Sequence, residues 1–301
     1  MSKVNAETSH THIKSMTIKL LSEHLSFGGK VGFYSHFSEA CHHEMRFSIY
    51  LPPQAQTKSV PVLYFLSGLT CTEEVFMAKA GAQKLAAEYG LILVVPDTSP
   101  RNTGIIGENQ DWDLGSGAGF YVDATQEPWR SHYQMYSYVT SELPTFIHQN
   151  FPTLPDRQGI FGHSMGGHGA LVCALRNPEQ YQSVSVFAAI AAPSQCPWGQ
   201  KAFTNYLGQD QTTWQAYDAT ELVKYQGFPR PILFDQGTAD TYLKNQLFTE
   251  AFLAACELAN QPLILRYQEG YDHGFYFVST FIADHIRHHA EALYAIADKT
   301  S

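Results

Sequence analysis

The sequence contains a serine whose flanking residues suit a nucleophile. Ser164 lies in the segment G-H-S-M-G (162–166), which follows the short apolar run 159–161 and precedes small residues with helical spacing over 166–176. On such a tight turn between a strand and a helix the hydroxyl is accessible, and the glycines leave room where β-carbons would collide. The N-terminus of the helix also directs backbone N–H groups toward developing negative charge. The pattern therefore predicts nucleophilic catalysis by Ser164.

A serine nucleophile needs a base to take its proton and an acid to orient that base. In the α/β-hydrolase architecture both follow the serine, first the acid and then the histidine, in loops after late strands. The expected strand 231–234 leads into D-Q-G-T-A-D, which offers Asp235 and Asp240. We favour Asp240 because it lies beyond Gly237, free to point at an imidazole. Asp235 adjoins the strand end and is expected to stabilise a turn.

His273 is the candidate base. It follows the expected strand 263–267 in the segment Q-E-G-Y-D-H-G, in the place where this architecture has its histidine. Its neighbour Asp272 is poorly placed to orient it and is expected to form a hydrogen bond within the loop. His163 and His168, which flank the serine, are expected to pack or to form local hydrogen bonds.

Two further groups of histidines have a spacing that metal ligands can use. They are His285, His288 and His289 within one turn of an expected C-terminal helix, and His42 and His43 beside Glu44. No further carboxylate or cysteine nearby completes a ligand set. We therefore expect both groups to lie on solvated surfaces, and we expect no metal.

The oxyanion of a tetrahedral intermediate needs two N–H donors. Met165, the residue after the nucleophile, supplies one, and the loop after an early strand supplies the other. Here that loop is 66–72, in which Gly68 permits the turn and Leu69 is the candidate donor. Cys71, in the same loop, is either a small buried apolar residue or part of the substrate pocket, where its oxidation would affect activity.

A segment without helical or strand periodicity spans residues 96–128 and is rich in Gly, Asp and aromatic residues. Long irregular loops are uncommon in compact domains and are usually functional, so we expect this one to shape the site. Its glycines at 115, 117 and 119 have no strand-to-helix context, and no lysine follows them. A nucleotide site is therefore not expected.

Alternating strands and helices must position these residues. Patterns typical of β-strands over 18–25, 31–37 and 44–51 predict an antiparallel meander at the start. Short apolar runs then alternate with helical segments, which predicts a mostly parallel sheet covered by helices on both faces. The later expected strands are 60–65, 91–95, 159–161, 183–189, 231–234 and 263–267, and the expected helices are 74–89, 166–176, 244–258 and 276–297. The predicted class is α/β, with a polar N-terminal tail (1–16) and one domain (17–301).

Composition excludes several classes of function. Of 301 residues, 44% are apolar and 16% are charged, which suits a globular core. The net charge of −9 argues against nucleic acid or an anionic membrane as the main partner. The five cysteines are widely spaced, which disfavours a disulfide scaffold. The polar N-terminus lacks the apolar core of a secretory signal, so we expect a cytoplasmic protein.

Seven segments together resemble the S-formylglutathione hydrolase (esterase D) family of α/β-hydrolases. In chain order they are S-F-G-G-K, L-S-G-L-T-C-T-E-E, P-D-T-S-P-R, G-A-G-F-Y-V-D-A-T, G-H-S-M-G-G-H-G-A-L, D-Q-G-T-A-D and G-Y-D-H, and they extend from near residue 19 over nearly the whole chain. Ser164, Asp240 and His273 match the family's triad, and Leu69 and Met165 match its oxyanion donors. The sequence D-H-G-F-Y-F departs from the small polar residue that often follows the histidine, which concerns only the pocket's shape.

The resemblance implies hydrolysis of S-formylglutathione to glutathione and formate, without metal or cofactor, by a homodimer or homotetramer. Because the net charge does not attract anionic glutathione, a local basic patch is expected, with Arg101 and Lys79 as candidates. Trp198 either lines the pocket or packs in the core. The alternatives are a general short-chain carboxylesterase, an acyltransferase, for which no acceptor site is evident, and a non-catalytic binding protein, which the complete Ser-Asp-His set disfavours.

Overall fold

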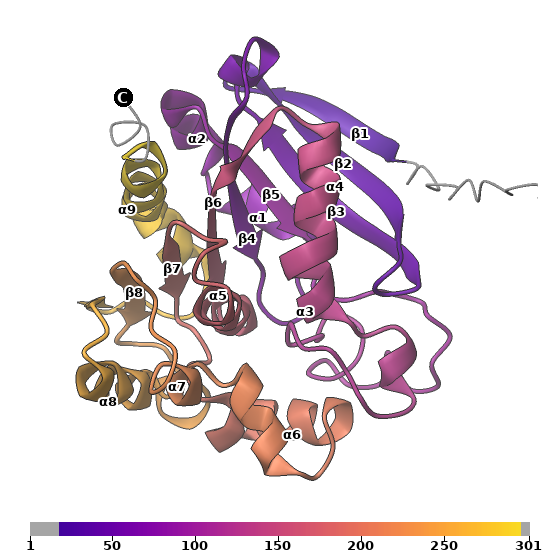
Figure 1. Cartoon of the computed structure of the whole chain (residues 1–301), viewed down its shortest axis with the longest axis vertical. Helices are drawn as coiled ribbons and strands as arrows, with labels where there is room; N and C mark the ends of the chain where they lie inside the picture. The colour runs from indigo at the N-terminus through magenta and orange to yellow at the C-terminus, as the bar shows by residue number, and fades with distance from the viewer. Residues whose placement is uncertain (1–17, 296–301) are drawn as a thin grey trace, which may run out of the picture.

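In this computed structural model, which describes residues 18–295, nine strands form one sheet (Figure 1). Their order is β1-β2-β3-β5-β4-β6-β7-β8-β9. β1, β2 and β3 form an antiparallel meander, β3 pairs antiparallel with β5, and all later pairs are parallel. The predicted sheet is therefore confirmed. The strands are β1 Lys19–Ser26, β2 Gly29–Ser38, β3 His43–Leu51, β4 Val60–Leu66, β5 Ile92–Pro96, β6 Thr153–His163, β7 Val184–Phe187, β8 Ile232–Gly237 and β9 Leu263–Gln268.

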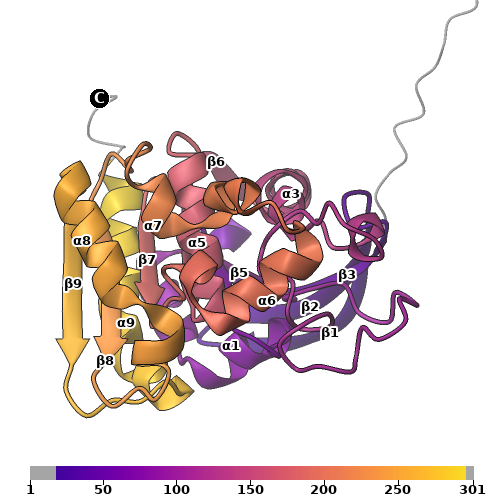
Figure 2. The same cartoon turned by 90° about the horizontal axis from the view of Figure 1, so that it is seen from below.

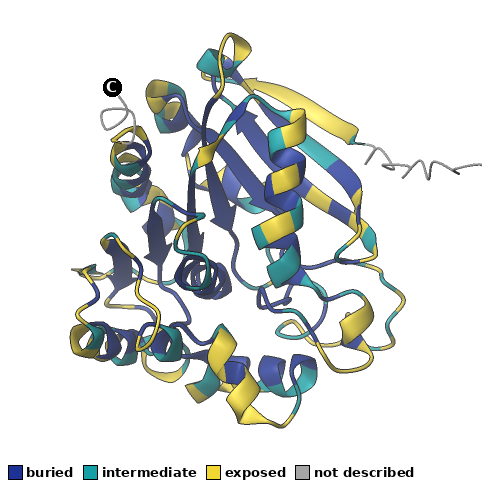
Figure 3. Ribbon diagram, viewed as in Figure 1, coloured by how far each residue is buried: buried dark blue, intermediate teal, exposed yellow. Residues whose placement is uncertain are grey.

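The sequences of the strands explain their places in the sheet. Every residue of β4, β5 and β7 is buried, as expected for apolar strands that helices cover on both faces. β1 forms one edge and is exposed along almost its whole length (Figure 3). Its charged residues Lys19 and Glu23 suit an edge strand, because charge discourages pairing with another chain.

Helices cover both faces of the sheet, as Figures 1 and 2 show. One face carries α1 (Glu73–Lys79), α2 (Gln83–Tyr89) and α9 (Phe275–Tyr294), and α2 contacts α9. The other carries α4 (Leu143–Asn150), α5 (Met165–Arg176), α7 (Ala219–Leu222) and α8 (Thr249–Ala259), with the short α3 (Met135–Ser137) and α6 (Pro197–Tyr206) alongside them. Apart from Pro96, which ends β5, the segment 96–128 has no helix or named strand, as predicted.

Several predicted boundaries were wrong, each for a local reason. The helix expected over 74–89 is two helices, because Gly81 at φ +71° interrupts it. The helix expected over 244–258 is two pieces, a π-helical turn (Leu243–Leu247) and α8 from Thr249, because Phe248 between them lies in the left-handed region at φ +53°. β6 and β8 are longer than their apolar runs, and β7 is shorter than expected. α4 was not predicted, although Leu143, Phe146 and Ile147 form its buried stripe. The predicted tail, 1–16, lies outside the described residues.

The expectation that the histidines of the C-terminal helix lie on a solvated surface was wrong. His285 and His289 are completely buried because α9 lies on the sheet, where β6 and β7 offer small residues. The two ring nitrogens of His289 lie 2.6 Å from Ser183 Oγ and 2.8 Å from Ser185 Oγ. A side chain at Gly159 would disturb this arrangement, since its Cβ would lie 2.6 Å from Ser183 Oγ and 3.0 Å from His289 Nδ1.

The second histidine group lies at the surface, as expected. His42 and Glu44 are exposed, and His43 is half-buried with its Nε2 2.9 Å from the Arg101 carbonyl oxygen. Between residues 18 and 295, no group of three or more His, Cys, Asp or Glu side chains is arranged to hold a metal ion. In the same part of the chain, no helix combines the length and apolar character needed to cross a membrane.

The half-buried His288 makes the stability of the fold depend on pH. Burial lowers the pKa of His288 to about 4. Between pH 6.5 and 4 the unfolded chain binds a proton that the folded chain does not, so the free energy of unfolding falls as the pH falls. His288→Gln should remove up to about 1.4 kcal/mol per pH unit of this dependence. Urea unfolding at a series of pH values measures it. His42→Gln, at an exposed position, should keep the wild-type slope, and an unchanged slope in His288→Gln would contradict the assignment.

Candidate active site

Ser164 stands on a strained turn between β6 and α5. Its backbone has φ +59° and ψ −121°, and its N–H donates to the Phe187 carbonyl at 3.0 Å. The flanking glycines are needed sterically. A Cβ at Gly162 would lie 2.2 Å from the Gly166 carbonyl oxygen, and a Cβ at Gly166 would lie 1.9 Å from the Leu66 carbonyl oxygen. Strained backbone of this kind persists only where the surroundings enforce it, and it concentrates at functional sites.

The structure brings the predicted serine, histidine and aspartate together in one hydrogen-bonded chain. His273 Nε2 lies 2.9 Å from Ser164 Oγ, and His273 Nδ1 lies 2.6 Å from Asp240 Oδ2. If the Nδ1 proton is donated to the carboxylate, Nε2 is free to accept the proton of the serine hydroxyl. Ser164 and Asp240 are buried, whereas the His273 side chain is 18% exposed and so meets the solvent side of the site.

Asp240 is held from several sides. Its Oδ1 accepts the backbone N–H of Tyr242 at 2.8 Å, and its Oδ2 also accepts from Gln236 Nε2 at 3.3 Å. Thr249 Oγ1 donates to Gln236 Oε1 at 3.0 Å, and this bond orients the Gln236 amide so that its Nε2 faces Asp240. Gln236 could not be singled out from the sequence, because its role depends on the contact between β8 and α8.

The loops after β8 and β9 meet through Gly237. A Cβ there would lie 2.3 Å from the Tyr271 carbonyl oxygen, and the Ala239 N–H donates to the same oxygen at 3.0 Å. Asp240 and His273 therefore approach each other from neighbouring strand ends. Asp272 accepts the Gly274 N–H at 2.9 Å, which confirms its predicted role within the loop.

The two N–H groups predicted to bind the oxyanion belong to Leu69 and Met165. Among residues 18–295, neither Leu69 N–H nor Met165 N–H has a hydrogen-bond acceptor, whereas the next N–H groups, of Thr70 and Cys71, are bonded to Gly117 and Gly68. The loop lies against the serine, since a Cβ at Gly68 would lie 3.1 Å from Ser164 Cβ.

The long loop 96–128 holds the loop 66–72 in place. The Tyr121 hydroxyl donates to the Ser67 carbonyl at 2.9 Å, and Thr98 Oγ1 donates to the Cys71 carbonyl at 2.7 Å. Phe120 and Tyr121 adopt positive φ angles of +47° and +50° although neither is glycine. His168 Nε2 lies 2.8 Å from the Phe120 carbonyl, which confirms its predicted local hydrogen bond.

An aromatic row extends from the histidine toward the predicted pocket residue Trp198. The Tyr242 ring lies 5.0 Å from the His273 ring and 4.7 Å from the Trp198 ring, and Trp112 lies a further 5.4 Å beyond Trp198 (centroid distances). Trp198 is 8% exposed, so it also packs in the core. Neither Tyr242 nor Trp112 was predicted, because only the fold brings their loops together.

Other predicted residues have different environments. Cys71 is partly exposed, and burial is the main factor that raises the pKa of its thiol, so the thiol is not activated. His163 is buried against His273, with ring centroids 4.7 Å apart, and burial holds its pKa well below the ordinary value. Arg101 pairs with Asp97, and Lys79 lies over the Phe275 ring.

Asp235 is not a turn residue, contrary to the expectation. It lies within β8, completely buried, and forms two hydrogen bonds of 2.6 Å with Arg266 of β9. Its Oδ2 also lies 3.4 Å from His285 Nε2 of α9. The carboxylate therefore points to the face of the sheet that α9 covers and takes part in a structural ion pair.

The chain has close relatives among known proteins. The model of the esterase family, described as "Putative esterase", matches residues 38–288. The S-formylglutathione hydrolase of Mus musculus is 56% identical over 282 residues, which is 93% of this chain and 100% of the relative. The protein of the same name from Paracoccus denitrificans is 52% identical over 279 residues, 93% of this chain and 99% of the relative.

Solved structures agree with this relationship. A structure of an S-formylglutathione hydrolase from Agrobacterium tumefaciens is 49% identical and superimposes with a TM-score of 0.89, covering 91% of this chain and 99% of the other. A ferulic acid esterase at 19% identity, with a TM-score of 0.69 over 89% of this chain and 100% of the other, shares the fold.

The two candidate acids can be separated by experiment. Asp235→Asn should lower the free energy of unfolding by about 1–3 kcal/mol, because Arg266 loses the charge of its buried partner but keeps its ion pair with Asp284. The folded variant should still react with a fluorophosphonate at Ser164 near the wild-type rate. Asp240→Asn should cost less stability but slow this labelling by a factor of about 10⁴, because His273 then loses its orienting carboxylate. Urea unfolding and labelling kinetics give both quantities, and the reverse order would exchange the two assignments.

Proposed function

This chain belongs to the S-formylglutathione hydrolase family of esterases, and we propose that it hydrolyses S-formylglutathione to glutathione and formate. The observation that carries the proposal is the hydrogen-bonded chain from Ser164 through His273 to Asp240. This arrangement suits acyl transfer to a serine. The identity of the substrate is inferred from the names of the relatives.

In the first half of the proposed reaction, Ser164 Oγ attacks the formyl carbon while His273 Nε2 takes the hydroxyl proton. The carbonyl oxygen becomes an oxyanion, which accepts hydrogen bonds from Leu69 N–H and Met165 N–H. Asp240 holds the His273 ring and stabilises its positive charge. The C–S bond then breaks, and His273 returns the proton to the leaving thiolate, so that glutathione departs and a formyl ester remains on Ser164.

In the second half, water takes the place of the thiol. His273 removes a proton from the water as it attacks the formyl ester, and the same two N–H groups stabilise the second oxyanion. The bond to Ser164 Oγ breaks, the serine regains its proton from His273, and formate leaves. The chemistry needs no metal or organic cofactor, because the side chains of the triad carry every proton transfer.

The pocket residues fit a small acyl group. The formyl group would lie beside Ser164, with Cys71 on the side of the loop 66–72 and Trp198 on the side of the aromatic row. Further parts of the proposal are a cytoplasmic, homodimeric or homotetrameric enzyme that acts on a small molecule, neither on nucleic acid nor at a membrane. The boundary between a tail (1–16) and a domain (17–301) stays a prediction.

Replacement of the nucleophile tests the mechanism. Ser164→Ala should lower kcat by a factor of about 10⁵–10⁶ while the fold is retained, because nothing else in the site can form the acyl-enzyme. Steady-state kinetics with S-formylglutathione and thermal unfolding measure the two effects. Ser59→Ala, at an exposed position, is the matched control and should match the wild type. Activity near the wild-type level in Ser164→Ala would refute the assignment.

A comparison of substrates tests the specificity. The value of kcat/KM for S-formylglutathione should exceed that for p-nitrophenyl acetate by a factor of about 10² or more, because contacts with the glutathionyl group lower the energy of the transition state. Both substrates are measured with one preparation. Comparable values, or a preference for the ester, would identify a general short-chain carboxylesterase instead.

A further inference from the structure

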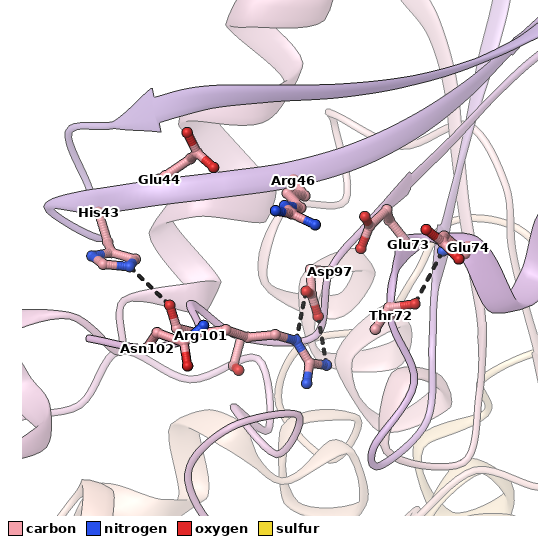
Figure 4. A pocket seen from close by; sticks show the side chains of 10 residues that line it. His43, Glu44, Arg46, Thr72, Glu73, Glu74, Asp97, Arg101 and Asn102 are labelled. Atoms are coloured by element: carbon pink, nitrogen blue, oxygen red, sulfur yellow. Dashed lines mark hydrogen bonds and ion pairs between the residues drawn. The ribbon is translucent and has the colours of Figure 1, made fainter. Parts of the chain in front are cut away.

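A cavity of about 390 Å³ lies beside the loop 66–72 (Figure 4). Its walls come from the start of β3, the start of α1 and the segment after β5. It is strongly charged, and the residues that matter here are Arg46, Glu73, Asp97 and Arg101. None of these side chains has a part in the chemistry at Ser164.

One pair of charges in this cavity is already satisfied. Arg101 donates from Nε to Asp97 Oδ2 at 2.7 Å and from Nη2 to Asp97 Oδ1 at 2.9 Å. Its Nη2 also donates to the Cys71 carbonyl at 3.0 Å, which links the cavity wall to the loop that carries Leu69. The charges of Arg101 and Asp97 therefore neutralise each other on this wall of the cavity.

Two other charged side chains in the cavity, Glu73 and Arg46, form no ion pair with any residue of the described part of the chain. Glu73 is 3% exposed, and in the described part of the chain its carboxylate has no ion pair and no hydrogen bond to another residue. The guanidinium of Arg46 also lacks both within residues 18–295. A buried charge without a partner is costly, and burial together with Asp97 raises the pKa of Glu73. Figure 4 shows both side chains pointing into the cavity.

A zwitterion fits this arrangement better than a simple ion. An ammonium group would compensate Glu73, and a carboxylate carried by the same molecule would compensate Arg46. The exposed Glu44 and Glu74 add negative charge at the walls, which disfavours a dianion such as phosphate. A bound metal ion is also disfavoured, since the described residues contain no suitable group of ligands.

The cavity lies at a suitable distance from Ser164. The serine follows β6, the loop with Leu69 follows β4, and Asp97 follows β5, which is the next strand in the sheet. Two strand spacings, from β6 to β5, correspond to about 10 Å. Arg46 lies on β3, one spacing beyond β5, and its side chain points into the cavity. An extended glutathionyl group covers roughly 10 Å from its sulfur to the α-carboxylate of its γ-glutamyl end, by ordinary backbone dimensions. Thr72, which ends the loop 66–72 and is not buried, lines the cavity.

We propose that this cavity is the subsite for the γ-glutamyl end of the substrate, with Glu73 binding the α-ammonium group and Arg46 the α-carboxylate. The inference rests on the proposed function, because it assumes a glutathionyl thioester. It also explains how a chain with a net charge of −9 binds an anionic substrate. Arg46 and Glu73 form a local dipole that is matched to one end of the molecule, whatever the total charge.

The test compares two thioesters that differ only at this end, S-formylglutathione and S-formyl-N-acetylcysteinylglycine, in which an acetyl group replaces the γ-glutamyl group. In the wild type the first should have the higher kcat/KM. Glu73→Gln and Arg46→Gln should each lower the ratio of the two kcat/KM values about 10- to 100-fold, mainly through KM, because each removes one charged contact. Glu88→Gln, at an exposed glutamate on α2, should leave the ratio unchanged.

Failure of this inference is distinguishable from failure of the proposed function. If the wild type prefers S-formylglutathione to p-nitrophenyl acetate but both variants keep the wild-type ratio of the two thioesters, the subsite is refuted and the function stands. A wild-type ratio near one also refutes the subsite. If S-formylglutathione is not preferred to the ester, the proposed function fails. Arg46 is exposed, so Arg46→Gln should fold even if Glu73→Gln does not.

Discussion

The close approach of two backbones, at the ends of β4 and β6, is the constraint on which the rest of the site depends. At Gly166 only a hydrogen atom fits, since a Cβ would collide with the Leu66 carbonyl oxygen, and a Cβ at Gly68 would crowd the Ser164 side chain. This contact places the loop that contains Leu69 against the Ser164 side chain. It also enforces the positive φ of Ser164, whose cost of about 1–3 kcal/mol the surrounding packing must offset.

The parallel sheet then gathers the remaining groups at one edge. Loops after β4, β6, β8 and β9 meet there because the carboxyl ends of parallel strands point the same way. The position of each carboxylate relative to its strand decides its role. Asp235 lies within β8 and is held by Arg266, whereas Asp240 lies beyond the strand end and reaches His273. Five residues of spacing thus separate a structural acid from the proposed catalytic one.

For the binding of an anion, the pairing of individual charged side chains matters more than the net charge of the chain. Arg101 was a candidate for attracting an anion, but its bond to Asp97 leaves it neutralised, and it is Arg46 that has no partner among the described residues. The sequence shows how many charges there are, but pairing depends on which side chains meet across β3, α1 and the segment after β5. For the same reason Gln236, Tyr242 and Trp112 could not be found before their neighbours were known.

What the sequence determined by itself was local chemistry. The G-H-S-M-G turn, the aspartate beyond Gly237, the histidine after β9 and the alternation of strands and helices are all properties of short segments, and the structure brings these residues together as expected. Only the tertiary structure decided the environment of each group. His285 and His289 show this most plainly. Their spacing of four residues predicts that they share one face of α9. Whether that face meets water or Ser183 and Ser185 depends on where the helix packs, a long-range contact that no short segment encodes.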